Sequence, residues 1–290
     1  MHLTGIFAPV VTPFHASSED LDVEGFARNV RAHIAEGLSG VVVAGSTGEA
    51  ALLSEQERAA LFATAREHTP VGQLVIAGCG GESTRQTIAR TRAAHEAGAD
   101  AVLVVAPHYY ASAMTEEVLR RHYLRVAEES PRPVILYNIP KYMHFALSAD
   151  LVAELAAHQN IVGIKDSSGA IEMLRGFLGA QSDTFSVLTG SGSGLQAGLE
   201  AGARGGILAV SLFAPSFALE VLRAVRAGDA AALTAAQGRL TPMANVIVAK
   251  LGVPGVKHAM DVVGNVGGNP RMPLLPLGEA ERAEVLAALG

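Results

Sequence analysis

A lysine stands at the end of an apolar run in residues 161–167 (IVGIKDS). The β-branched residues before it predict a strand that is buried on both faces. Lys165 would then have its stem in the core, so its ammonium must find a partner or lose its proton. A neutral lysine amine is a nucleophile for carbonyl carbons. A lone strand-end lysine could equally extend to a surface salt bridge. The other lysines, Lys141, Lys250 and Lys257, end no comparable run.

The composition limits the classes of protein to which this chain can belong. It has 290 residues, of which 49% are hydrophobic and 17% charged, which allows a sizeable core and excludes a disordered chain. The formal net charge is −6 and no basic tract stands out, so we expect no nucleic-acid partner. Cys79 is the only cysteine, which excludes an internal disulfide and a multi-cysteine metal site. Without a signal peptide or a membrane-spanning run, we expect a cytoplasmic protein with no membrane partner.

Strand-like apolar runs alternate with helical periodicity along most of the chain. The predicted strands cover residues 5–11, 41–44, 74–77, 101–105, 134–137, 161–165, 185–188 and 207–210. Capping boxes that begin helices are expected at Ser54 and Ser83. Eight such units predict an α/β fold, a (β/α)₈ TIM barrel over residues 1–228. A doubly wound open sheet is the alternative and would need a reversal of strand order. From Asp229 helix follows helix, so residues 229–290 are predicted to form a C-terminal helical region.

In such a barrel, the residues that follow the strands gather at one mouth. The polar residues at these positions are Ser46, Thr47, Glu49, Tyr109, Tyr110, Tyr137, Asn138, Lys165, Asp166, Ser167, Ser191, Ser193 and Ser211. They offer an amine nucleophile, phenols that can carry protons, and hydroxyls beside backbone N–H groups. This set suits Schiff-base chemistry on a carbonyl substrate that carries a carboxylate.

Schiff-base chemistry also needs a proton carrier and a carboxylate site. When a lysine amine replaces a keto oxygen, the positive iminium lets the neighbouring carbon lose a proton and become an enamine. Tyr137, on the strand before Lys165, is our candidate for moving that proton, although a tyrosine with its ring in the core and its hydroxyl in water is the simpler interpretation of Tyr137 alone. The turn at residues 45–49 would supply N–H donors and hydroxyls to a carboxylate. Residues 190–194 could hold an anion or form a flexible glycine turn.

Four stretches of this chain, in this order, resemble the dihydrodipicolinate synthase / N-acetylneuraminate lyase family of pyruvate-handling class I aldolases. They are residues 45–49 (GSTGE), 137–140 (YNIP), 163–169 (GIKDSSG) and 271–274 (RMPL). Together they are specific, and the similarity covers essentially the whole chain. The resemblance implies a lyase with no separate cofactor and no metal, because the substrate is bound covalently through a lysine Schiff base.

The resemblance also implies roles for individual residues. Lys165 would form the Schiff base with pyruvate or another 2-oxo acid, and Tyr137 would relay protons. Ser46 and Thr47 would hold the carboxylate and the tyrosine hydroxyl, while the backbone of Ile207 would face the bound pyruvate.

An aromatic residue of this family crosses a dimer interface into the neighbouring site in several members. Tyr110 matches that position, or Tyr109 if the loop is shifted by one. Family members are commonly homotetramers built as dimers of dimers, so the resemblance implies the same assembly for this chain.

The residues expected to bind the second substrate are used to predict which reaction of this family the chain catalyses. Lysine-biosynthetic synthases resemble this chain except for an arginine shortly after the Tyr-Asn-Ile-Pro stretch, where residues 141–144 are KYMH. An acidic pair after strand seven is replaced by Ser191-Gly192-Ser193, where we expect Ser191 to bind substrate. The replacement of the acidic pair, together with residues 252–257 (GVPGVK) and 267–268 (GG), makes the chain more similar to 4-hydroxy-2-oxoglutarate aldolases. Lys141 or His144 would replace the missing arginine.

We therefore predict a 4-hydroxy-2-oxo acid aldolase that releases pyruvate and an aldehyde. The alternative is 4-hydroxy-tetrahydrodipicolinate synthase, which condenses pyruvate with aspartate semialdehyde. A non-catalytic barrel that binds a 2-oxo acid is a further alternative from another class. A phosphate-binding isomerase that uses residues 190–194 would need a carboxylate base, for which Asp166 is the clear candidate.

Overall fold

The computed structural model describes residues 1–290, and its centre is a closed barrel of parallel strands that pair in sequence order. The strands are β1 (Gly5–Pro9), β2 (Gly40–Val43), β3 (Leu74–Gly78), β4 (Ala101–Val105), β5 (Val134–Asn138), β6 (Ile161–Asp166), β7 (Ser186–Thr189) and β8 (Gly205–Ile207). β1 pairs with both β2 and β8, which closes the sheet. This is the predicted TIM barrel, and the closure excludes a doubly wound open sheet.

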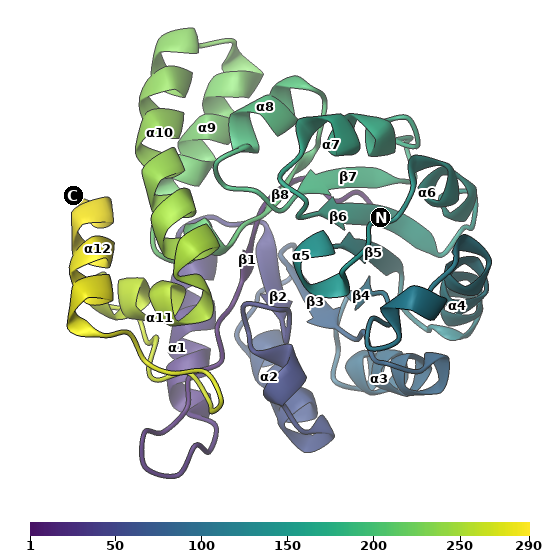
Figure 1. Ribbon diagram of the computed structural model, residues 1–290, viewed down its shortest axis with the longest axis horizontal. Helices are drawn as coiled ribbons and strands as arrows, with labels where there is room; N and C mark the ends of the chain where they lie inside the picture. The colour runs from purple at the N-terminus through teal and green to yellow at the C-terminus, as the bar shows by residue number, and fades with distance from the viewer.

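Helices surround the barrel and cover the outer faces of its strands (Figure 1). They are α1 (Val23–Ala35), α2 (Glu55–Glu67), α3 (Thr84–Glu96), α4 (Glu116–Glu129), α6 (Ala149–Leu155), α7 (Ile171–Leu178), α8 (Leu195–Glu200) and α9 (Pro215–Ala227). The short helix α5 (Pro140–Met143) follows β5 and lies at the barrel mouth, and there are single 3₁₀ turns η1 (Ala50–Leu52), η2 (Ala111–Ala113) and η3 (Ala209–Leu212). With helices outside and side chains packed within, the strands are buried on both faces, which explains their continuous apolar runs.

The two predicted capping boxes have different outcomes. At Ser54 both halves are present, because Ser54 Oγ accepts from Glu57 N at 3.2 Å and Glu57 Oε2 accepts from Ser54 N at 2.8 Å. At Ser83 only the first half forms, with the Gln86 N–H donating to Ser83 Oγ at 3.1 Å. The Gln86 side-chain amide instead donates to Glu55 at 3.4 Å, so a contact between helices replaces the local one.

The prediction for the eighth strand was wrong in its position. The strand spans Gly205–Ile207, and the residues after it form the turn η3. Two glycines begin the strand because a Cβ on Gly205 would lie 1.9 Å from the Gly5 carbonyl oxygen of β1. Glycine is a weak strand former, so this part of the strand gave no signal in the sequence. Ser211, expected at the mouth, is instead fully buried and donates to the Leu208 carbonyl at 2.7 Å.

The C-terminal residues form helices against one side of the barrel mouth (Figure 1). α10 (Ala230–Met243) packs on α9, a π-helical segment η4 (Ala244–Lys250) continues it, and α11 (Gly252–Val262) and α12 (Glu279–Leu289) follow. Pro242, which has no N–H to donate, lies just before the π-helical segment. Residues 264–271 lie outside any helix.

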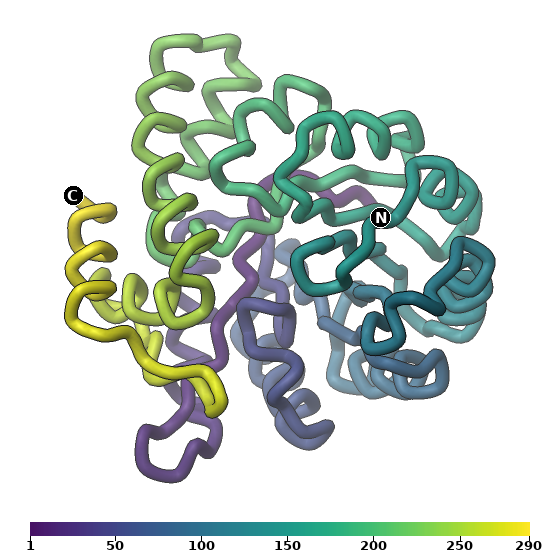
Figure 2. Tube along the Cα trace, viewed as in Figure 1, coloured from purple at the N-terminus to yellow at the C-terminus, as the bar shows by residue number.

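The loop between α11 and α12 returns to the start of the chain. Figure 2 shows this yellow segment beside the purple loop that precedes α1. There, Arg271 Nη2 donates to the Glu19 carbonyl at 2.6 Å.

None of the helices combines the length and the apolar character that crossing a bilayer requires.

Candidate active site

A cavity of about 340 Å³ opens between the barrel mouth and the C-terminal helices. Its lining from the barrel includes Ser46, Thr47, Tyr137, Lys165, Ser167, Ser168, Ser191, Ser193 and Ile207. η4 and α11 close the other side with a mainly apolar wall of Ala244, Val248, Ala249, Gly252, Val253 and Val256. The charged residues of the lining are Lys165 and Lys141, and no carboxylate is among them. Such a cavity favours an anionic ligand.

Lys165 and Tyr137 enter this cavity from neighbouring strands. They are register partners in the pairing of β5 with β6, and Lys165 Nζ lies 4.3 Å from the centroid of the phenol ring. Both residues are buried, with 6% and 4% of their surface exposed. The lysines that form ion pairs are Lys250 and Lys257. Lys165 therefore does not form the surface salt bridge that was the alternative to its role as a nucleophile.

Hydrogen bonds around Asp166 fix the ends of these two strands. Its Oδ1 accepts from Asn138 Nδ2 at 2.8 Å and from Ser168 N at 3.1 Å, and its Oδ2 accepts from Ser168 Oγ at 2.7 Å. Asp166 is buried and does not line the main cavity. Its carboxylate is therefore committed to holding Lys165 in place. A phosphate-binding isomerase would lack the base that it needs.

The turn at residues 45–49 presents hydrogen-bond donors to the cavity. The N–H groups of Gly48 and Glu49 donate back to Gly45 O and Ser46 O, at 3.0 and 3.2 Å. The N–H groups of Ser46 and Thr47 form no hydrogen bond within the chain. Two free N–H groups beside two hydroxyls form a concave site for an anion. Ser46 Oγ also lies 3.4 Å from Tyr137 Oη, so the turn reaches the phenol.

The glycine-rich loop after β7 is held by hydrogen bonds, which excludes the flexible turn. The Ser191 N–H donates to Thr189 Oγ1 at 3.1 Å, and Ser191 Oγ accepts from Gly194 N at 3.1 Å. Gln237 of α10 donates to the Gly192 carbonyl at 3.1 Å. Ser191 and Ser193 line the cavity with their hydroxyl oxygens 3.3 Å apart. The loop therefore offers hydroxyls in fixed positions in the same cavity as the turn at residues 45–49.

The remaining predicted residues divide between the cavity and the surface. Ile207, the last residue of β8, is buried and lines the cavity. Lys141 also lines it, with its Nζ 3.4 Å from the Ala249 carbonyl, whereas His144 does not. Tyr109 and Tyr110 are 78% and 68% exposed and pack edge to face, with ring centroids 5.0 Å apart. Neither lines the cavity of a single chain.

Glu49 and Lys257 form a buried ion pair that the sequence analysis missed. We expected Glu49 at the mouth, but its side chain points away from the cavity and is fully buried. Its Oε1 lies 2.5 Å from Lys257 Nζ of α11, and its Oε2 accepts from the Arg271 N–H at 2.8 Å. Burial lowers the pKa of Lys257, and the Glu49 carboxylate opposes that shift. No spacing rule connects two residues so far apart in the chain.

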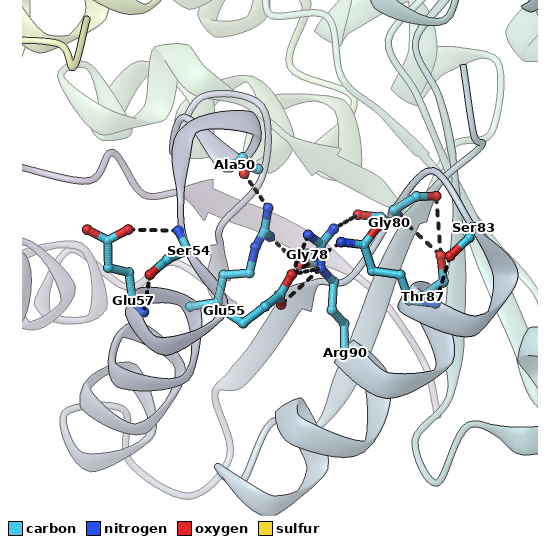
Figure 3. A network of polar contacts seen from close by, with 12 residues as sticks. Ala50, Ser54, Glu55, Glu57, Gly78, Gly80, Ser83, Thr87 and Arg90 are labelled. Atoms are coloured by element: carbon cyan, nitrogen blue, oxygen red, sulfur yellow. Dashed lines mark hydrogen bonds and ion pairs between the residues drawn. The ribbon is translucent and has the colours of Figure 1, made fainter. Parts of the chain in front are cut away.

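A second buried cation braces the same turn from the side of α2. Arg58 donates to the Ala50 carbonyl and, at 3.3 Å, to the Gly78 carbonyl at the end of β3. Burial, aided by the nearby Arg90 guanidinium, lowers the pKa of Arg58 to about 10. In Figure 3, Arg90 of α3 and Glu55 of α2 point toward one another, and their shortest contact is 2.7 Å. Charged side chains therefore hold the end of the turn from two sides, Lys257 of α11 at Glu49 and Arg58 of α2 at the following residue, Ala50.

Comparison with known proteins gives consistent results. The sequence model of the dihydrodipicolinate synthetase family matches residues 2–290. A 4-hydroxy-tetrahydrodipicolinate synthase of Sorangium cellulosum is 36% identical over 288 residues, which cover 99% of this chain and 95% of the relative. The crystal structure of a dihydrodipicolinate synthase from Bacillus anthracis has a TM-score of 0.95 at 30% identity and covers 100% of this chain and 98% of the other.

Pyruvate is bound in at least two of the similar crystal structures. One of them is a chloride-inhibited dihydrodipicolinate synthase from Acinetobacter baumannii, complexed with pyruvate. Its TM-score is 0.93 at 31% identity, and the match covers 99% of this chain and 98% of that one.

Proposed function

This chain belongs to the dihydrodipicolinate synthetase family, a family of lyases, and on that premise we propose that it joins pyruvate to an aldehyde through a Schiff base on Lys165. The single observation that carries the proposal is the buried amine of Lys165 beside Tyr137 in a cavity without carboxylates. Pyruvate bound to a solved relative in this family supports the choice of keto acid.

In the proposed mechanism, the neutral amine of Lys165 adds to the keto carbon of pyruvate and water leaves. The carboxylate of pyruvate would accept hydrogen bonds from the free N–H groups of Ser46 and Thr47 and from their hydroxyls. The iminium then acts as the electron sink, and the methyl carbon of pyruvate loses a proton to give an enamine. Tyr137, within reach of Ser46, would accept and return the protons. Ile207 would contact the bound pyruvate through its backbone.

The enamine then attacks the carbonyl carbon of the aldehyde and forms the new carbon–carbon bond, and the reverse sequence cleaves it. An open-chain 4-hydroxy-2-oxo acid is released by hydrolysis of the iminium, which consumes the water lost when the Schiff base formed. If the aldehyde carries an amine, that amine instead attacks the iminium carbon, closes a ring and displaces Lys165. Either step regenerates the Lys165 amine, and atoms and protons balance without another reactant. In this scheme the lysine itself provides the electron sink that a separate cofactor provides in other enzymes.

For the aldehyde, we propose aspartate semialdehyde as the first candidate, which makes the chain a 4-hydroxy-tetrahydrodipicolinate synthase. The names of the curated relatives from several organisms support this alternative better than the 4-hydroxy-2-oxo acid aldolase that we expected from the sequence. Aspartate semialdehyde carries a carboxylate, which agrees with a cavity lined by two lysines and no acid.

One observation keeps the 4-hydroxy-2-oxo acid aldolase as a second candidate. No arginine lines the cavity, and Lys141 is the cation available to a distal carboxylate, with the Ser191 and Ser193 hydroxyls in the same cavity. A 4-hydroxy-2-oxo diacid would place its carboxylates at Lys141 and at the turn of residues 45–49. The two candidates therefore use the same cavity and differ in the second substrate.

The assembly and the cellular location are part of the same proposal. We propose a cytoplasmic homotetramer in which Tyr110 of one chain reaches the cavity of its neighbour, with Tyr109 as the alternative. The exposure of both rings supports this, since large exposed aromatics mark protein–protein contacts. One solved relative is described as a monomeric dihydrodipicolinate synthase variant, so the mass in solution has to be measured. A monomer with full activity would exclude a role for a neighbour's tyrosine.

The decisive experiment traps the Schiff base. The protein is incubated with pyruvate and borohydride, and the intact and peptide masses are recorded. We expect the mass of reduced pyruvate on the Lys165 peptide and none on the Lys165→Ala variant. A folded protein that forms no adduct with any 2-oxo acid would contradict the proposal and support a non-catalytic binding barrel. Turnover with aspartate semialdehyde, compared with cleavage of 4-hydroxy-2-oxoglutarate, then separates the two candidates.

A further inference from the structure

We propose that the buried ion pair of Glu49 and Lys257 positions the turn at residues 45–49 for binding the carboxylate of the keto acid. The inference rests on the proposed function, because it takes Ser46 and Thr47 as the carboxylate site. Glu49 and Lys257 are positioning residues, since neither lines the cavity. They act through the N–H groups and hydroxyls that the turn presents.

The first argument is the burial of the pair. The side chains of Glu49 and Lys257 are 0% and 1% exposed, and Glu49 Oε1 has no donor other than the Lys257 ammonium. Removing two charges from water costs more than an ordinary ion pair returns, and an apolar pair of the same size stabilises a fold as well or better. A buried pair at this place therefore indicates that geometry is its main contribution.

The second argument is the conformation of the backbone around the turn. Ala44, just before the turn, and Glu49, its last residue, have φ angles of 53° and 56°, a left-handed conformation that residues with side chains seldom adopt. Such a conformation persists only where surrounding contacts enforce it. The Glu49 carboxylate is held at one oxygen by Lys257 and at the other by the Arg271 N–H at 2.8 Å. These contacts fix the strained end of the turn and, with it, the direction of the N–H groups.

The third argument is the place of Lys257 in the fold. Its helix, α11, contributes Val253 and Val256 to the cavity wall, while Lys257 faces the turn. The ammonium also donates to the Asn269 carbonyl at 2.8 Å and lies 4.6 Å from the centroid of the Phe14 ring. The pair thus joins the helix that closes the cavity to the turn that binds the carboxylate.

The test is a double variant, Glu49→Gln with Lys257→Met, which removes both charges and nearly preserves the side-chain volumes. The readout is the pyruvate concentration that half-saturates borohydride trapping on Lys165, measured by intact mass. Misplacing a binding group by about 1 Å can cost on the order of 100-fold, so we expect this concentration to rise by at least about tenfold. The far-ultraviolet circular dichroism spectrum should remain that of the wild type.

The matched control is an ion pair at the opposite end of the barrel. Arg66 Nη1 lies 2.9 Å from Asp100 Oδ2. Asp100 is the residue immediately before β4, at the end of the strand that is away from the cavity. The double variant Arg66→Met with Asp100→Asn should lower the thermal midpoint and leave the half-saturating pyruvate concentration unchanged. The comparison separates a positioning role of the Glu49 pair from a general loss of stability.

A wild-type half-saturating concentration in the Glu49→Gln/Lys257→Met variant would overturn the inference. If that variant does not fold, Glu49→Asp replaces it. This substitution keeps both charges and shortens the side chain by one methylene, so it should displace the turn and raise the same concentration. An unchanged value would again overturn the inference. If the wild type traps no pyruvate, the proposed function fails and the inference fails with it, whereas trapping in the wild type isolates the inference.

Discussion

Tyr137 and Lys165 are register partners on β5 and β6, and the lysine nitrogen lies 4.3 Å from the centroid of the phenol ring. Side chains in register on adjacent parallel strands point to the same side of a sheet. The pairing of β5 with β6 therefore brings an amine and a phenol together in the barrel mouth. Because no carboxylate lines the cavity, the phenol is the group whose removal tests proton transfer in the proposed reaction.

The first prediction concerns that phenol. Tyr137→Phe keeps the buried ring and removes only the hydroxyl that lies 3.4 Å from Ser46 Oγ. We expect kcat to fall by about 10²- to 10⁴-fold, the usual contribution of a positioned acid–base group. The Schiff base should still form on Lys165, but more slowly, so a time course of borohydride trapping checks the result. A variant with unchanged kcat would remove Tyr137 from the mechanism.

The second prediction tests whether Lys165 acts as a nucleophile or only as a positive charge. Lys165→Arg keeps a cation at the end of β6, but a guanidinium stays protonated in proteins and cannot attack a carbonyl carbon. We expect no trapped adduct and no turnover above background, with a circular dichroism spectrum like that of the wild type. Trapping of pyruvate on any other lysine of this variant would show that the assignment of Lys165 is wrong.

The third prediction concerns the second substrate. Lys141 lines the cavity and His144 does not, so Lys141 is the residue that can contact a distal carboxylate. Lys141→Met should raise the KM for aspartate semialdehyde by about tenfold, which corresponds to about 1.4 kcal/mol. The KM for pyruvate should not change, and the control variant His144→Ala should change neither value. Equal effects of the two substitutions would contradict this division of roles.

The fourth prediction is an acid destabilisation caused by buried histidines. Burial lowers the pKa of His33 and of His122 from 6.5 to about 4. At a pH between the folded-state and unfolded-state pKa values, these histidines are protonated in the unfolded chain and neutral in the folded chain. Stability is therefore lost as the pH falls from about 6.5 to about 4. A shift of this size corresponds to on the order of 3 kcal/mol for each histidine.

His33 offers the cleaner test, because burial alone lowers its pKa, whereas the Glu82 carboxylate opposes the lowering of the His122 pKa. His33→Leu should reduce the loss of thermal midpoint between pH 6.5 and pH 4.5, as followed by circular dichroism, and leave the midpoint at pH 8 nearly unchanged or higher. A midpoint that falls as steeply as in the wild type would exclude His33 as a cause. Glu57 should contribute to the loss of stability at a lower pH than the histidines. The Arg271 guanidinium lowers the pKa of Glu57 to about 2, so its contribution to stability is lost only as the pH falls below about 4.5.

The sequence was sufficient for most of the barrel because strand burial and helix periodicity are local signals. The strand at Ala101–Val105 was predicted with the observed bounds. The eighth strand was not, because close contact with the β1 backbone selects a glycine at Gly205, and Gly205 and Gly206 carry no strand signal. The second half of the Ser83 capping box was lost to a contact with another helix.

By itself, the sequence determined which residues could do the chemistry: a lysine after a buried strand, a tyrosine after the preceding one, and hydroxyls in two glycine turns. These follow from residue type and from the rule that strand ends share one mouth. Only the tertiary structure decided which side chains face the cavity. Ser211 turned inward after a shifted strand, and Asp166 was committed to hydrogen bonds with its neighbours.

The tertiary structure alone also paired Glu49 with Lys257, and it chose Lys141 over His144 for the cavity wall. The physical reason is that a charge removed from water must find its partner in space. Packing can bring that partner from any point along the chain, and spacing in the sequence does not record it.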